Sequence, residues 1–329
     1  MPSDQGAGML GVAGPTGALA PAAQSAWSRL GAMARDIKLA HSVFALPFAL
    51  LGAFLARKSA WPGVWGFVGQ LAIIVVCMVA ARTWAMLVNR LVDRHIDAAN
   101  PRTAKRAFAS GRVSAASGWV VAFAAAVAFV GATSLFWAFF GNRWPALLSL
   151  PVLAWIALYS LTKRFTALCH VVLGVALAAS PVAAAIAVNP SSVIEPLWPP
   201  SVPSVWMLAL MVAAWVAGFD IIYALQDIEV DRREGLRSIP ARLGARGAIL
   251  VSRGLHAMAL LFLVGAWLSD GTLGPIFGGA VVLAGALLVM EHVVLARRGE
   301  AGLDMAFFTL NGIVSCVVGA AGCVDAAIN

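Results

Sequence analysis

Long unbroken apolar stretches dominate this chain and limit what it can fold into. Of its 329 residues, 61% are hydrophobic and only 12% are charged, which is about half the charged share of an ordinary soluble domain. A soluble core could not bury so much apolar side chain, and an outer-membrane barrel would alternate apolar and polar residues over short strands. The composition therefore predicts an all-α, polytopic membrane protein.

A helix needs about 20 apolar residues to cross the hydrocarbon core of a bilayer, and nine stretches of the chain approach or exceed that length. We expect residues 27–329 to form a single transmembrane domain. Residues 1–26 lack the positively charged start of a signal peptide, so we expect a flexible tail there rather than a cleaved targeting segment. The expected spans are 39–56, 64–90, 115–140, 144–161, 167–188, 204–226, 247–268, 273–295 and 305–327.

The basic residues support this count and give it a direction. With the N-terminus in the cytoplasm, 19 of the 23 Lys and Arg residues fall in cytoplasmic segments, and Arg82 lies within a span. Cytoplasmic loops of membrane proteins collect basic residues, so the pattern predicts an N-in, C-out protein of the cell inner (plasma) membrane, surrounded by membrane lipid. The net charge of +8 therefore needs no nucleic-acid partner.

Two of the cytoplasmic loops stand out because each joins acids at helical spacing to a run of bases. Residues four or seven apart lie on one stripe of a helix, so each set of acids would share one face. The similarity of the two segments predicts two four-helix pseudo-repeats plus one extra helix, with a site where the repeats meet. The first set is Asn89, Asp93 and Asp97, and the second is Asp220, Asp227 and Asp231, flanked by Tyr223.

Crowded carboxylates repel one another unless a cation joins them. Mg²⁺ commonly binds through a few carboxylates together with the phosphates of a ligand, and neighbouring Arg and Lys residues would bind the remaining phosphate oxygens. The pattern predicts a Mg²⁺-diphosphate site at the cytoplasmic edge of the membrane. Solvated helix ends with positive-inside loops would explain the bases, but not two acid stripes with similar spacing.

Four segments resemble the motifs of the UbiA-type family of membrane prenyltransferases. The resemblance extends over nearly the whole chain from about Arg29, in the family's order. One difference is "RAFASG" at residues 106–111, where many members have Pro. The matching segments are NRLVDRHID (89–97), RTAKRAFASG (102–111), YSLTKR (159–164) and DIIYALQDIEVD (220–231).

The resemblance implies transfer of a polyprenyl group from a polyprenyl diphosphate to the ring of an aromatic acid in quinone biosynthesis. It implies Mg²⁺ bound by Asp93, Asp97, Asp227 and Asp231. These carboxylates, with Tyr223 and Lys163, would be the catalytic residues. The substrate-binding residues that it implies are Asn89, Arg102, Arg106, Tyr159, Arg164 and Asp220.

The segment DIKLAHSVFALPFALLGA (36–53) differs from the family's common first helix. It is similar to a 4-hydroxybenzoate polyprenyltransferase-like branch, part of which acts on a 1,4-dihydroxy-6-naphthoate-type acceptor for menaquinone. The resemblance implies that His41 and Ser42 touch the acceptor, although capping or packing would also explain His41. The sequence does not decide between the 4-hydroxybenzoate-like and the naphthoate-type acceptor.

An ion-coupled membrane transporter is the alternative from another functional class, since it too would have repeats and intramembrane acids. Transporter sites lie near the middle of the membrane at broken helices, whereas these acids stand at predicted helix ends. Release of diphosphate from an allylic diphosphate would distinguish the enzyme from the transporter.

Overall fold

The computed structural model describes residues 31–33, 44–57, 61–194, 201–303 and 305–329, and the regular elements in these ranges are all helices. His41 and Ser42 lie outside the described residues. The elements are α2 (Leu46–Ala56), α3 (Val64–Val92), α4 (Arg94–Ala99), α5 (Ala115–Phe140), α6 (Trp144–Thr162), α7 (Cys169–Val188), η3 (Pro190–Ser192), α8 (Pro203–Tyr223), η4 (Ala224–Asp227), α9 (Ile228–Arg233), α10 (Ile239–Ser269), α11 (Pro275–Arg298), η5 (Gly299–Gly302), η6 (Met305–Leu310) and α12 (Asn311–Ile328).

Eight helices in the described ranges are long and apolar enough to cross a membrane: α3, α5, α6, α7, α8 continued through α9, α10, α11, and η6 continued into α12. The stretch 39–56, expected as a ninth span, contains α2, an apolar helix of 11 residues; residues 39–43 lie outside the described ranges. The helical membrane class is thus confirmed. Nine spans, the pseudo-repeats and the N-in, C-out orientation stay predictions.

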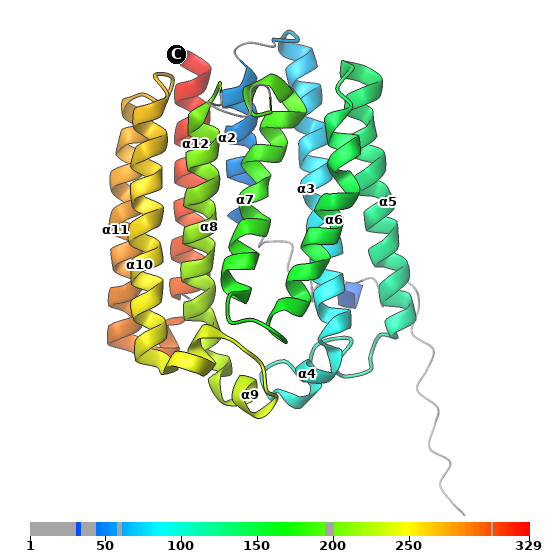
Figure 1. Cartoon of the computed structure of the whole chain (residues 1–329), viewed down its shortest axis with the longest axis vertical. Helices are drawn as coiled ribbons and strands as arrows, with labels where there is room; N and C mark the ends of the chain where they lie inside the picture. Colours follow the sequence, from blue (N-terminus) through cyan, green and yellow to red (C-terminus); the bar gives the residue numbers. More distant parts are fainter. Residues whose placement is uncertain (1–30, 34–43, 58–60, 195–200, 304) are drawn as a thin grey trace, which may run out of the picture.

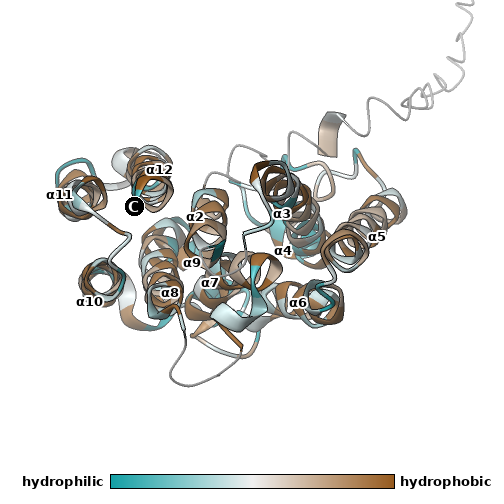
Figure 2. Ribbon diagram, turned by 90° about the horizontal axis from the view of Figure 1, so that it is seen from above, coloured by the Kyte–Doolittle hydropathy of each residue, from teal (hydrophilic) through white to brown (hydrophobic). Residues whose placement is uncertain are grey.

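The helices stand side by side along the long axis of the molecule, with α4 and α9 at one end and the C-terminus at the other (Figure 1). Seen end-on, α2 and α7 lie between a group of α8, α10, α11 and α12 and a group of α3, α5 and α6 (Figure 2). Helix α8 packs against α7 and α10, α2 against α7 and α12, and α3 against α5 and α6.

Two glycines allow the central helices to approach closely. A Cβ atom on Gly52 of α2 would lie 2.3 Å from the carbonyl oxygen of Pro181 in α7. A Cβ atom on Gly174 of α7 would lie 2.2 Å from the carbonyl oxygen of Ala213 in α8. Because lipid supplies no strong hydrophobic drive between helices, such close packing through small residues is a main source of cohesion in membrane bundles.

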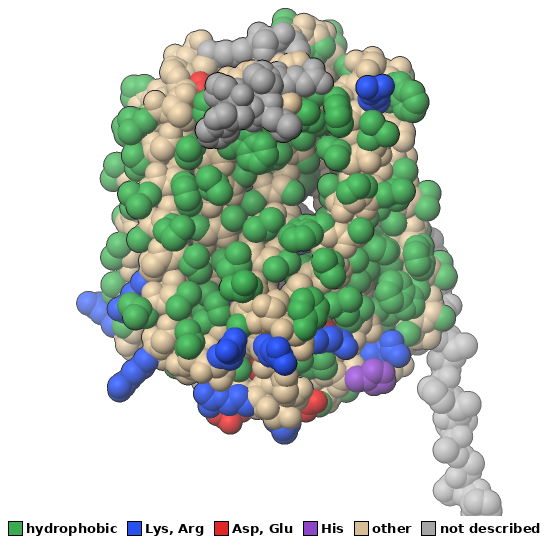
Figure 3. Space-filling model, in the orientation of Figure 1, with side chains coloured by type: hydrophobic (Ala, Val, Ile, Leu, Met, Phe, Trp, Pro, Cys, Tyr) green, Lys and Arg blue, Asp and Glu red, His purple; other side chains and the backbone are tan. Residues whose placement is uncertain are grey.

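Charge and apolar surface are separated along the bundle axis. Basic side chains gather at the end that carries α4 and α9, and a wide apolar band covers the middle of the same face (Figure 3). Val120, Val127, Leu261 and Val282 are each more than two-thirds exposed, as expected for side chains that face lipid tails. The loops with acids and bases therefore lie at one end of the bundle.

Candidate active site

The first acidic tip, residues Asn89–Asp97, lies where α3 gives way to α4. Helix α3 ends at Val92, and Asp93 caps it before α4 begins. Asp93 and Asp97 are only 2% and 7% exposed. The Asn89 side chain donates a hydrogen bond to Asp93 Oδ2 over 3.4 Å. Asn89 and Asp93 are therefore in contact, and the helix is interrupted at Asp93.

Bases from two other segments neutralise the first tip. Lys163, at the end of α6, places Nζ 2.6 Å from Asp93 Oδ2. Arg164 donates through Nη2 to Asp93 Oδ1 over 3.1 Å and to the Val92 carbonyl over 2.9 Å. Arg106, from the loop after α4, places Nη1 2.7 Å from Asp97 Oδ1. Burying these carboxylates is tolerated because each has a basic partner.

The second acidic tip, residues Asp220–Asp231, contacts the loop that follows the first tip, and this contact joins the two tips. Arg102 donates through Nε to Asp227 Oδ1 over 3.2 Å and through Nη2 to Asp227 Oδ2 over 2.5 Å, a bidentate pair. Its Nη1 donates to the Tyr223 hydroxyl over 3.1 Å. Asn100 also donates to Asp227 Oδ1 over 2.8 Å. Segments far apart in the sequence therefore meet at this end of the bundle.

The Arg102 guanidinium keeps its charge at this junction. Burial alone would lower the pKa of Arg102, but the Asp227 carboxylate and the Tyr223 hydroxyl together raise it above its ordinary value. The guanidinium also lies 5.3 Å from the centroid of the Tyr223 ring, a cation–π distance. A permanent cation between the two tips suits the binding of phosphate oxygens.

The spacing of the acids in the second tip predicted one continuous α-helix. The structure instead divides this segment into three helical pieces. Helix α8 ends at Tyr223, a 3₁₀ turn covers Ala224–Asp227, and α9 follows. A 3₁₀ turn has fewer residues per turn than an α-helix, so side chains on either side of it no longer share one stripe. Asp220 pairs instead with His170 of α7, over 2.7 Å between Oδ2 and Nδ1. Asp231 lies half-buried on α9.

His170 was not assigned from the sequence. It is 3% exposed, and no metal-ligand spacing surrounds it in the chain. Its relation to Asp220 depends on the packing of α7 against α8. A contact between two helices that depends on their packing cannot be predicted from residue spacing within one segment.

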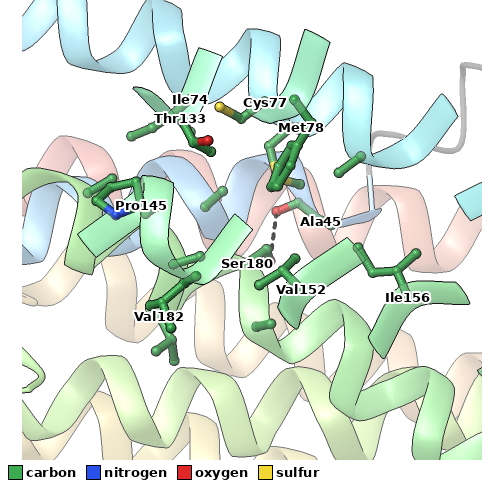
Figure 4. A pocket seen from close by; sticks show the side chains of 18 of the residues that line it. Ala45, Ile74, Cys77, Met78, Thr133, Pro145, Val152, Ile156, Ser180 and Val182 are labelled. Atoms are coloured by element: carbon green, nitrogen blue, oxygen red, sulfur yellow. Dashed lines mark hydrogen bonds between the residues drawn. The ribbon is translucent and has the colours of Figure 1, made fainter. Parts of the chain in front are cut away.

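A cavity of about 310 Å³ runs between α2, α3, α5, α6 and α7 and is lined mainly by apolar side chains (Figure 4). Tyr159, one helical turn before Lys163 on α6, lines it. Among the described residues of its lining, the one charged residue is Arg82, about two turns before Asn89 on α3. Arg82 Nε is buried and has no hydrogen-bond partner among the described residues. The sequence indicated Arg82, because this basic residue lies well inside the expected span 64–90, where a charge is costly.

The model of the UbiA prenyltransferase family matches residues 45–313. The chain belongs to this family. A UbiA homologue from Aeropyrum pernix K1 has the same fold, with a TM-score of 0.74, 32% identity, and coverage of 88% of this chain and 98% of that one. The enzyme class expected from the four motifs, a membrane prenyltransferase, is thereby confirmed.

Two bacterial relatives carry the same named activity. The 4-hydroxybenzoate octaprenyltransferase of Yersinia pseudotuberculosis serotype IB (strain PB1/+) is 29% identical over 261 residues, covering 76% of this chain and 85% of the relative. That of Chromohalobacter salexigens is 28% identical over 248 residues, covering 72% and 78%. A more distant structure, a UbiA homologue from Archaeoglobus fulgidus bound to GPP and Mg²⁺, shares the fold at a TM-score of 0.66 and 17% identity, over 90% of this chain and 100% of that one.

The carboxylates of this UbiA-family site have the donor chemistry of a Mg²⁺ site but do not form a ready-made cage. In the described part of the chain, no group of three or more His, Cys, Asp or Glu side chains converges to hold a metal ion. Bases instead neutralise Asp93, Asp97 and Asp227 one by one. Mg²⁺ often binds through one or two carboxylates plus substrate phosphates, and carboxylates on both tips fit that mode.

Proposed function

We propose that this protein transfers a polyprenyl group from an isoprenoid diphosphate to the ring of an aromatic acid, in a Mg²⁺-dependent step of quinone biosynthesis. The observation that carries the proposal is the junction of the two tips, in which Arg102 and Asn100 bind Asp227. Acids and bases from four segments thereby meet near one end of an apolar cavity. The named activity of the bacterial relatives, and the GPP and Mg²⁺ held by a homologue of the same fold, support it.

The basic side chains of the two tips would bind the diphosphate. Arg102, Arg106, Lys163 and Arg164 provide donors that match phosphate oxygens. When the allylic C–O bond breaks, its electron pair moves to the diphosphate oxygen, and these cations stabilise the departing anion. Mg²⁺ would be held by Asp93, Asp97, Asp227 and Asp231, and it would supply further stabilisation of the negative charge.

The cavity would accept the aromatic acid and part of the prenyl chain. Arg82 would pair with the acid's carboxylate, since a buried guanidinium calls for an anionic partner. The face of Tyr159, which lines the cavity, would favour the allylic cation, and the Tyr223 hydroxyl would position Arg102 for the diphosphate. The ring carbon then attacks that cation, a C–C bond forms, and the displaced ring proton passes to the Asp220 carboxylate, which His170 holds in place.

The test is product mass analysis with purified protein, Mg²⁺, prenyl diphosphates of several lengths, and both 4-hydroxybenzoate and 1,4-dihydroxy-6-naphthoate. We expect one prenylated acid with an equal amount of diphosphate, and no product after chelation of divalent cations. Arg82→Leu should raise KM for the aromatic acid about tenfold, the scale of a lost charge-assisted hydrogen bond, and leave KM for the diphosphate unchanged. Transport of a solute with no diphosphate release would contradict the proposal.

The site would face the cytoplasm of the cell's inner membrane. The support is the clustering of basic side chains at the end with α4 and α9 (Figure 3), together with the rule that basic loops remain in the cytoplasm. Labelling of a cysteine introduced at Lys105, which is exposed, by a membrane-impermeant reagent tests this orientation. Labelling in inverted vesicles, but not in intact cells, is the expected result.

A further inference from the structure

A second set of buried polar groups lies among α8, α10, α11 and α12, outside the site described above. Glu291 and Asn311 are fully buried and His256 is 4% exposed. His256 Nδ1 lies 3.1 Å from His292 Nε2 and 3.9 Å from Glu291 Oε2. Polar groups inside membrane-spanning helices are costly to bury, so this cluster calls for a role that the proposed chemistry does not give it.

Asn311 is the centre of the cluster, and its side-chain amide binds three helical elements. Its Oδ1 accepts a hydrogen bond from Trp215 Nε1 of α8 over 2.6 Å. Its Nδ2 donates to Glu291 Oε1 of α11 over 3.2 Å and to the Ala306 carbonyl over 2.9 Å. Ala306 belongs to η6, a π-helical turn, and such turns are rare and frequent at functional sites. Glu291 thus anchors the amide that holds the turn.

The next residue of that turn reaches the site. The Phe307 ring stacks on the Tyr223 ring with centroids 4.2 Å apart and an interplanar angle of 28°. Tyr223 in turn accepts the hydrogen bond from Arg102, whose other nitrogens bind Asp227. A continuous path of contacts therefore runs from Glu291 through Asn311, the turn and two stacked rings to the junction of the tips.

We propose that Glu291 and Asn311 are positioning residues, which hold the π-helical turn so that Phe307 fixes Tyr223 and, through it, Arg102 for binding of the diphosphate. The proposal rests on the proposed function for the role of Arg102. Loss of the anchor should weaken diphosphate binding and leave binding of the aromatic acid unchanged, because Arg82 and most of the cavity wall belong to α3, α5, α6 and α7.

Two substitutions at Glu291 form a matched pair. Gln keeps an oxygen that accepts from Asn311, whereas Met has a similar size and no such oxygen. Binding of inorganic pyrophosphate with Mg²⁺ is measured by titration calorimetry on the full-length protein in detergent. We expect Glu291→Met to weaken this binding about fivefold, the scale of one hydrogen bond, and to raise KM for the prenyl diphosphate but not for the aromatic acid. Glu291→Gln should stay within about twofold of the unmodified protein.

A double-substitution cycle tests the path itself. Phe307→Leu alone should show the same selective weakening, and Glu291→Met should add almost nothing in the Phe307→Leu background, since coupled residues are not additive. Equal effects of Gln and Met, equal losses for both substrates, or full additivity would overturn the proposal. If Glu291→Met does not fold, Asn311→Ser takes its place in the cycle. A native protein that binds no pyrophosphate would instead refute the proposed function, on which this inference rests.

Discussion

The two acidic tips look alike in the sequence but differ in the folded protein. In the first tip, Asp93 and Asp97 are nearly buried and pair with bases at the end of α6 and in the loop after α4. In the second tip, the Asp227 side chain is 19% exposed, and its basic partner, Arg102, comes from the loop after the first tip. Similar spacing thus produces a buried ion-paired tip and a more open one.

The burial of each carboxylate, and not its residue type, decides what it contributes to stability and to chemistry. A buried carboxylate with two basic partners contributes to stability as well as to chemistry, because its removal leaves cations without a counter-charge. A partly exposed pair contributes little to stability, because water screens it. A carboxylate in such a pair can exchange its basic partner for a ligand.

The largest effects are expected from replacing one Asp in each tip, which should reduce turnover in both cases but stability in only one. Asp93→Ala and Asp227→Ala should both reduce turnover by at least about a thousandfold, since each removes a proposed Mg²⁺ ligand. Asp93→Ala should also lower the free energy of unfolding by about 2 kcal/mol, whereas Asp227→Ala should lower it by less than about 1 kcal/mol. Product formation and thermal unfolding in detergent measure the two quantities.

The exposed Glu229 of α9 provides the matched control for these substitutions. Glu229→Ala removes an acid from the second tip without touching the junction, so we expect little change in turnover or in unfolding. Retention of activity in either Asp variant would contradict the assignment of the tips.

Replacing Arg102 or Arg164 by Lys should have an intermediate effect, and the effect should differ between the two tips. Arg102 binds Asp227 through two nitrogens, and Lys cannot reproduce that planar fork. Arg102→Lys should therefore raise KM for the prenyl diphosphate about tenfold, whereas Arg164→Lys, at a site with one nitrogen on Asp93, should raise it only about threefold. Steady-state kinetics with the aromatic acid held constant would detect the difference, and equal effects would argue against a special role for the junction.

The smallest expected effect concerns the Asp220–His170 pair. His170→Gln retains a donor for Asp220, and His170→Leu removes it. We expect His170→Leu to lower kcat by about fivefold, and His170→Gln by less than about twofold, because one buried hydrogen bond is at stake. The same loss in both variants would show that the histidine acts through its volume and not through Asp220.

The sequence predicted the helical membrane class and most of the candidate spans. These features depend on local physics, namely the length of apolar runs and the spacing of residues on a helix. The sequence also placed Asn89 and Asp93 on one face of a helix, and their side chains are hydrogen-bonded. The prediction of one stripe for Asp220, Asp227 and Asp231 was wrong, because the 3₁₀ turn at Ala224–Asp227 has no sequence signal that periodicity can detect.

By itself, the sequence determined that the chain is a bundle of membrane helices with acids and bases concentrated in two loops. Only the tertiary structure decided that Arg102 binds Asp227, that Arg82 lines an apolar cavity, and that Asn311 connects Glu291 to the turn beneath Tyr223. These contacts join helices far apart in the chain. Their geometry follows from how closely the helices pack, as at Gly52 and Gly174, and no local pattern of residues fixes that distance.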